Sequence, residues 1–164
     1  MATLTELTNN IAAARDQLRA AIDGATDSWE DATLPPEADE VNPNSTGDAW
    51  TPKQAVTHAV GGVSFFSSFL ATGLGIDFTI SRPSIETPED ALDALDAAFE
   101  AVDALVAAAS DDALTLPAPV GDGQIMYATT RGYEVQKDVT GALSMLALHT
   151  ADHAEQIVRG TATT

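Results

Sequence analysis

Residues 135–160, VQKDVTGALSMLALHTADHAEQIVRG, carry the pattern that decides the fold. Apolar side chains recur in this segment at spacings of three and four residues, which places them on one face of an α-helix. The members of this stripe are Val135, Val139, Ala142, Leu146, His149, His153 and Ile157. Because the stripe is unbroken, it predicts a helix that begins near Gly132 rather than at Asp138 and ends at Gly160.

Two earlier segments show the same periodicity. The first predicted helix runs from about Thr3 to Asp27. The third opens at Thr87, a capping residue followed by a proline and two acidic residues that suit the helix dipole, and it ends near Ser110. The core face of this third helix is predicted to hold Leu92, Leu95, Phe99, Val102 and Val106.

Another helix, the second in chain order, begins at Thr51 and Pro52. Threonine is a good N-cap, and proline suits the first helical position because its missing N–H would be unpaired there. Gly73 and Gly75 are predicted to end the helix. The predicted core-facing stripe holds Ala55, His58, Gly62, Phe65 and Phe69, and Phe66 and Leu70 widen it.

Residues 31–49, 76–87 and 111–132 are predicted connections, because proline, glycine and asparagine interrupt the periodicity there. Within the last of them, residues 124–130 are predicted to form a short strand or an extended crossover. Four helices without an internal repeat predict an all-α, four-helix bundle, formed by residues 1–164 as a single domain. The long connections permit crossovers, so consecutive helices need not alternate in direction.

The charge balance argues against two classes of partner. The chain has 25 acidic and 7 basic residues, and its formal net charge is -18. Nucleic-acid binding needs a basic surface, and an anionic membrane would repel this chain, so we expect neither partner. The acidic excess has two readings: a strongly solvated surface, or a halophilic protein in a salt-rich cytoplasm that screens self-repulsion.

Cysteine is absent, which excludes disulfides, thiolate nucleophiles and cysteine metal sites. The first part of the chain contains charged residues and no continuous apolar region of the signal-peptide kind. No stretch approaches the roughly 20 apolar residues that span a bilayer. We therefore expect a cytoplasmic protein.

The 3 histidines of the chain, His58, His149 and His153, all lie on predicted core faces. His149 and His153 are four residues apart and therefore one turn apart on the same helix face. Three neutral imidazoles without a thiolate suit Zn, Ni, Co or Fe and leave a coordination position open. Burying three imidazoles without a ligand would leave polar nitrogens unpaired at about 1–3 kcal/mol each, a cost that a shared metal removes. The alternative is three core histidines with ordinary hydrogen-bond partners. Neighbouring Gly61 and Gly62 remove bulk beside His58, which lets a helix pack closely or leaves room for a ligand.

Asp152 and Glu155 flank the histidine pair of the last helix. Asp152 lies about 100° around the helix from His153, so it is predicted to be solvated rather than a ligand. Gln156 lies one turn beyond His153 on roughly the same side. It is therefore a candidate for holding that histidine in place.

Four further residues are candidates for the surroundings of the site. Trp50 precedes the second helix and is predicted either to pack that helix onto the bundle or to line a pocket. Tyr127, Arg131 and Tyr133 would approach the mouth of the site if the last crossover passes over it. Otherwise they are surface residues of a loop. No residue is assigned a catalytic role from the sequence.

Two segments resemble the DinB/YfiT-like superfamily. Residues 50–58, WTPKQAVTH, are similar to the tryptophan-containing start of the family's second helix with its first histidine. Residues 148–157, LHTADHAEQI, are similar to the family's last helix with its pair of histidines. The resemblance implies a four-helix bundle of up-down-down-up topology, a divalent metal held by His58, His149 and His153, and a homodimer.

The resemblance also implies a range of activities. Members include transferases that use low-molecular-weight thiols, a thiol-dependent isomerase, and proteins assigned as metal-dependent hydrolases. We therefore expect thiol S-transferase chemistry on a small-molecule substrate, with Zn or Ni as the leading metal and Fe, Co or Mn as others. The alternatives are a hydrolase and a non-enzymatic, metal-stabilised binding or stress-response module. Arg131 and Arg159 are the candidates for contacting an anionic thiol.

Overall fold

The computed structural model describes residues 2–32 and 49–162, so most of the predicted connection at residues 31–49 lies outside the described residues. In the described ranges the regular structure is helical and contains no strand. The five α-helices are α1 (Leu4–Gly24), α2 (Pro52–Leu74), α3 (Pro88–Ala108), α4 (Asp122–Thr130) and α5 (Val139–Thr161). Two short 3-10 helices, η1 (Thr26–Ser28) and η2 (Asp111–Thr115), follow α1 and α3.

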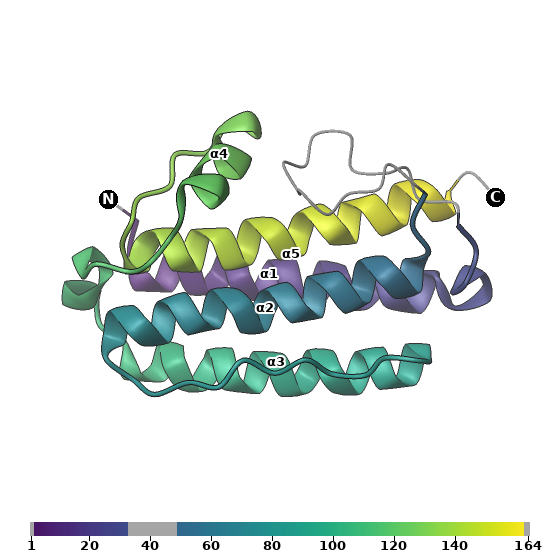
Figure 1. The fold of residues 1–164 in the computed structure, drawn as a ribbon, viewed down its shortest axis with the longest axis horizontal. Helices are drawn as coiled ribbons and strands as arrows, with labels where there is room; N and C mark the ends of the chain where they lie inside the picture. The colour runs from purple at the N-terminus through teal and green to yellow at the C-terminus, as the bar shows by residue number, and fades with distance from the viewer. Residues whose placement is uncertain (1, 33–48, 163–164) are drawn as a thin grey trace.

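The four long helices lie alongside one another, while the short α4 stands over α5 (Figure 1). α5 packs against α1 and α2, and α3 packs against α2 and α1. The apolar core lies between these helices. Its largest fully buried side chains include Leu18, Ile22, Leu70, Leu95, Phe99, Leu143, Met145, Leu146 and Ile157.

Contacts between helix ends establish how the long helices run. Trp29, just after α1, accepts a hydrogen bond at its carbonyl from the Lys53 amide at 3.1 Å. Its indole Nε1 donates to the Glu86 carbonyl at 3.0 Å. The starts of α2 and α3 therefore lie beside the end of α1. At the opposite end, the Leu4 amide donates to Asp111 Oδ1 at 2.8 Å, so the end of α3 lies beside the start of α1.

Three helices begin at capping threonines, of which Thr51 and Thr87 were predicted as caps. Thr3, Thr51 and Thr87 each accept a hydrogen bond from the backbone three residues later, and the side chain at that later position bonds back to the cap. These reciprocal bonds satisfy two backbone amides that a helix start leaves unpaired. At the other end of α2, Gly75 takes the left-handed conformation (φ 69) that ends many helices.

The predicted start of the last helix near Gly132 is wrong. α5 begins at Val139, and the Asp138 side chain caps it by accepting a hydrogen bond from the Gly141 amide at 2.8 Å. Val135 is buried as the stripe predicted, but in a non-helical segment that folds back against the first turn of α5. Gly141 permits this, because a Cβ there would collide with the carbonyl of Gln136.

The prediction of a short strand or extended crossover at residues 124–130 is also wrong, because these residues belong to α4. Neighbouring glycines hid its helical pattern. Ala128 is the one residue of α4 that is buried, so the helix has little apolar stripe to detect. Its stability comes from tertiary contacts with α5.

The predicted core stripe of α2 is rotated relative to the observed one. Phe65 is 39% exposed, and Phe69 is only half-buried. The buried face carries the predicted Ala55, Phe66 and Leu70 together with Val56, Ala59, Val60 and Val63. The reason is that α2 packs against both α5 and α3, so its apolar face is wide and does not centre on His58.

By length and composition, α2 is the one described helix that is apolar enough to cross a membrane, with a mean hydropathy of 1.2. Of the window that passes this test, 56% is buried inside the protein. The packing of α2 between α5 and α3 accounts for its apolar character as a core helix.

Candidate metal site

The three histidines converge between α2 and α5. His149 Nε2 lies 3.2 Å from His58 Nε2 and 3.2 Å from His153 Nε2. The ligand atoms that the three residues offer all lie within 4.8 Å of one another. In the described part of the chain, this group holds three histidines and no carboxylate. His149 and His153 are buried, whereas His58 is half-buried at the edge of α2.

Gln156 orients the ring of His153. The Gln156 Oε1 atom lies 2.9 Å from His153 Nδ1, and an amide oxygen can only accept, so Nδ1 is the donor. The proton of the neutral ring then sits on Nδ1, and Nε2 presents its lone pair to the other two histidines. Such a bond to the second nitrogen is the usual partner of a metal-binding histidine.

The three Nε2 atoms cannot all pair by hydrogen bonding among themselves. A neutral imidazole nitrogen offers either one proton or one lone pair. His149 Nε2 has two nitrogen neighbours at 3.2 Å, so it cannot make a good hydrogen bond to each of them at once. A cation that accepts three lone pairs removes this conflict. The donor set therefore fits a divalent metal bound by neutral imidazoles.

Burial keeps the triad neutral. Desolvation lowers the pKa of His58, and it lowers the pKa of His149 well below its usual value with a further contribution from the neighbouring histidines. Desolvation, followed by the charge of His58, lowers the pKa of His153 to about 3 against the hydrogen bond to Gln156. Because neutral imidazole is the form that binds metals, these shifts favour metal binding at neutral pH.

Aromatic side chains surround the triad. Trp50 stacks parallel to His153, with ring centroids 6.2 Å apart, and meets His58 edge-on at 5.3 Å. The Phe66 ring meets His149 at 5.2 Å. Trp50 thus lines the site, which was one of its two predicted roles. Phe66 was predicted to widen the core-facing stripe of α2, but its contact with His149 was not predicted.

The prediction that Asp152 is solvated is wrong, because this residue holds α4 against α5. Its side chain is 22% exposed and forms an ion pair with Arg131. The Tyr127 hydroxyl donates to Asp152 Oδ2 at 2.6 Å, and the Arg131 guanidinium stacks on the Tyr127 ring at 3.7 Å. These contacts bring the Tyr127 ring to 6.1 Å from that of His149. The sequence could not reveal this, because the helix that covers Asp152 was not recognised.

The two arginines that were candidates for an anionic thiol have different surroundings. Arg131 is near the triad, and its charge contributes to lowering the pKa of His153, but Asp152 pairs with it. Arg159 lies on an exposed part of α5, where its side chain is 65% exposed and 3.7 Å from Glu155. Of the two, only Arg131 is placed to influence the triad.

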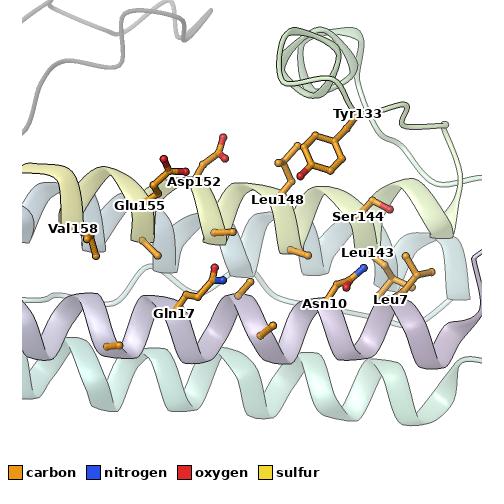
Figure 2. A pocket seen from close by; sticks show the side chains of 16 residues that line it. Leu7, Asn10, Gln17, Tyr133, Leu143, Ser144, Leu148, Asp152, Glu155 and Val158 are labelled. Atoms are coloured by element: carbon orange, nitrogen blue, oxygen red, sulfur yellow. The ribbon is translucent and has the colours of Figure 1, made fainter.

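Tyr133 lies away from the triad. It is 56% exposed and lines a groove of about 740 Å³ between α1 and α5, which none of the three histidines lines. Figure 2 shows this groove with Asn10 and Gln17 on α1 and Leu148 on α5. Asp152 borders the groove as well, so it is the residue common to the groove and to the surroundings of the triad.

Comparison with known protein families agrees with the fold and the histidine cluster. The profile of the DinB superfamily matches residues 10–157, which cover all three histidines. The chain therefore belongs to the DinB superfamily. No curated protein and no solved structure matches the chain.

Proposed function

We propose that this protein is a metal-dependent enzyme that transfers a low-molecular-weight thiol to a small electrophile. His58, His149 and His153 would hold a divalent metal, with Zn or Ni as the leading choices. The observation that carries the proposal is the convergence of three imidazole Nε2 atoms without a carboxylate in the described part of the chain. Three protein ligands leave a position open, which is the pattern of catalytic rather than structural sites.

When bound, the metal supplies a positive charge that stabilises a thiolate or hydroxide near neutral pH. The residues of the chain have supporting roles. Gln156 accepts a hydrogen bond from His153 Nδ1 at 2.9 Å, so that Nε2 presents its lone pair to the site. Trp50 packs against the ring of His153, and Phe66 packs against the ring of His149. Tyr127 adds a wall on the α4 side.

A hydrolase is the second candidate, because the same open position can accept water in place of a thiol. Thiol transfer and hydrolysis can be distinguished by measuring thiol consumption. The chain contains no cysteine, so the protein itself contributes no thiol to this assay. The protein, purified without an affinity tag and analysed for metal, would be given a chromogenic electrophile with and without added thiol. Turnover that requires the thiol supports transfer, and turnover without any thiol overturns it in favour of hydrolysis.

A non-enzymatic, metal-stabilised module is the third candidate. His153→Ala separates it from the enzymes, because the substitution removes one donor from the site. If the metal is lost while the melting temperature stays nearly unchanged, the metal serves chemistry. If the fold collapses with the metal, the metal is structural.

We further propose that residues 1–164 form a single domain with an up-down-down-up four-helix bundle and assemble as a cytoplasmic homodimer. The starts of α2 and α3 both lie beside the end of α1, so these two helices run parallel to each other and opposite to α1 (Figure 1). This arrangement supports the proposed topology. Light scattering on the purified protein tests the dimer. A monomeric mass at micromolar concentration would contradict it.

A further inference from the structure

Gly62 lies at the point where α2 meets the ring of His149. A Cβ atom added at Gly62 would lie 2.6 Å from His149 Nδ1 and 3.3 Å from His149 Nε2, and closer still to the ring carbon Cε1. Packed side chains do not approach one another so closely. The imidazole of His149 therefore occupies the space that any side chain at residue 62 would need.

His149 lacks the hydrogen bond that orients its neighbour. Its Nδ1 atom is buried and has no hydrogen-bond partner in the described part of the chain, whereas His153 Nδ1 is held by Gln156. A metal-binding histidine normally has its second nitrogen bonded, and that bond sets the direction of the ring. The His149 ring instead fills the space beside Gly62 that a side chain there would occupy, and it meets the Phe66 ring.

We infer that Gly62 is a positioning residue, whose bare backbone fixes the ring of His149 so that Nε2 faces His58 and His153. The consequence for metal binding rests on the proposed function, but the close packing of Gly62 and the His149 ring does not depend on a metal. Gly61 provides a matched control, because a Cβ added there would meet nothing within 4 Å. The two glycines are adjacent on one helix and differ in this contact.

Cobalt(II) tests the consequence for the site, since its visible absorption reports the number and geometry of its ligands. We expect Gly62→Ala to weaken Co²⁺ binding by about 10–100-fold, the usual cost of disturbing the support of a metal ligand, and to change the spectrum. Gly61→Ala should bind Co²⁺ within about twofold of the parent protein. Parental affinity and spectrum in Gly62→Ala would overturn the inference.

A double-mutant cycle in metal-free protein tests the contact independently of any metal. Alanine stabilises a helix relative to glycine, so Gly61→Ala should raise the melting temperature by about 1–4 °C. Gly62→Ala should lower it in the parent protein but raise it when His149→Ala has removed the ring. Equal shifts in both backgrounds would overturn the inference. If the parent protein itself fails to bind Co²⁺, the proposed function fails, and this cycle alone decides the role of Gly62.

Discussion

At the scale of single residues, two histidines on one helix are held in different ways. His153 is oriented by a hydrogen bond to Gln156, and His149 by packing against α2. The role of Gln156 could be predicted from the sequence, because a residue three positions along a helix lies on nearly the same side. The contact with Gly62 could not, because it depends on how closely α2 and α5 approach.

The buried triad predicts an acid-sensitive fold in metal-free protein. The pKa of folded His153 is about 3, whereas the unfolded chain takes up a proton near pH 6.5. The unfolded state therefore binds more protons between these values, and the free energy of unfolding falls as the pH drops below about 6.5. Urea unfolding of chelator-treated protein at about pH 7.5 and pH 5.5 measures this change.

The control for this measurement is His153→Gln, which removes the titrating group and keeps a polar side chain. Both proteins contain the same carboxylates, so the difference between their losses of unfolding free energy reports the contribution of His153. We expect the variant to lose less stability over the same pH interval. An identical loss in the two proteins would contradict a depressed pKa at His153.

At the scale of elements, α4 is attached by a small apolar contact, in which Ile125 and Tyr127 pack against the core beside Ala128, and by polar contacts with Asp152. Ala128 is its one buried residue, and Asp152 on α5 receives both Tyr127 and Arg131. Helices that bury little apolar surface open more readily than the rest of a fold. Asp152 therefore couples the position of α4 to the helix that carries two of the three histidines.

Asp152→Asn should loosen α4 without unfolding the bundle. The substitution preserves size but removes the charge that pairs with Arg131, whose side chain is only 21% exposed. We expect amide hydrogen exchange in residues 122–131 to accelerate by roughly tenfold or more, with the long helices unchanged. Hydrogen-exchange mass spectrometry measures both at once.

Asp122→Asn is the matched control, because it removes an ion pair of α4 that lies in solvent. The Asp122 side chain is 91% exposed and 2.7 Å from Lys137. Exposed ion pairs contribute about 0–1 kcal/mol, so this variant should leave exchange in α4 nearly unchanged. Equal acceleration in the two variants would show that Asp152 does not hold α4.

At the scale of the whole molecule, the large negative net charge is the feature that most affects the stability of the fold. A net charge of -18 on 164 residues makes the folded state repel itself. The cations of the long helices pair with exposed carboxylates, as Arg15 does with Asp103, and such pairs relieve little of this repulsion. Mobile ions of the solvent are therefore the main source of compensation.

Stability should rise with salt. The screening length falls from about 10 Å at 0.1 M to about 3 Å at 1 M, so the repulsion between acidic side chains weakens. We expect the melting temperature of the parent protein to increase steadily with potassium chloride over this range. Sodium chloride at the same ionic strength should act similarly if screening is the cause. A melting temperature that is indifferent to salt would contradict the halophilic reading.

The sequence by itself determined the features that depend on local interactions. The capping threonines place the starts of α2 and α3, and the spacing of His149 and His153 puts both on the buried side of α5. Composition determined the acidic surface and the absence of a thiol in the chain. Each of these follows from neighbours along the chain, within one or two helical turns.

Only the tertiary structure decided what lies against the triad. Periodicity shows that a helix has an apolar face, but not which helices share it, so the buried face of α2 was predicted only in part. The helix α4 is stabilised by Asp152 across a long sequence separation, and no local pattern encodes that pairing. For the same reason, the need for a glycine at residue 62 becomes visible only when the packing of α5 on α2 brings the His149 ring beside it.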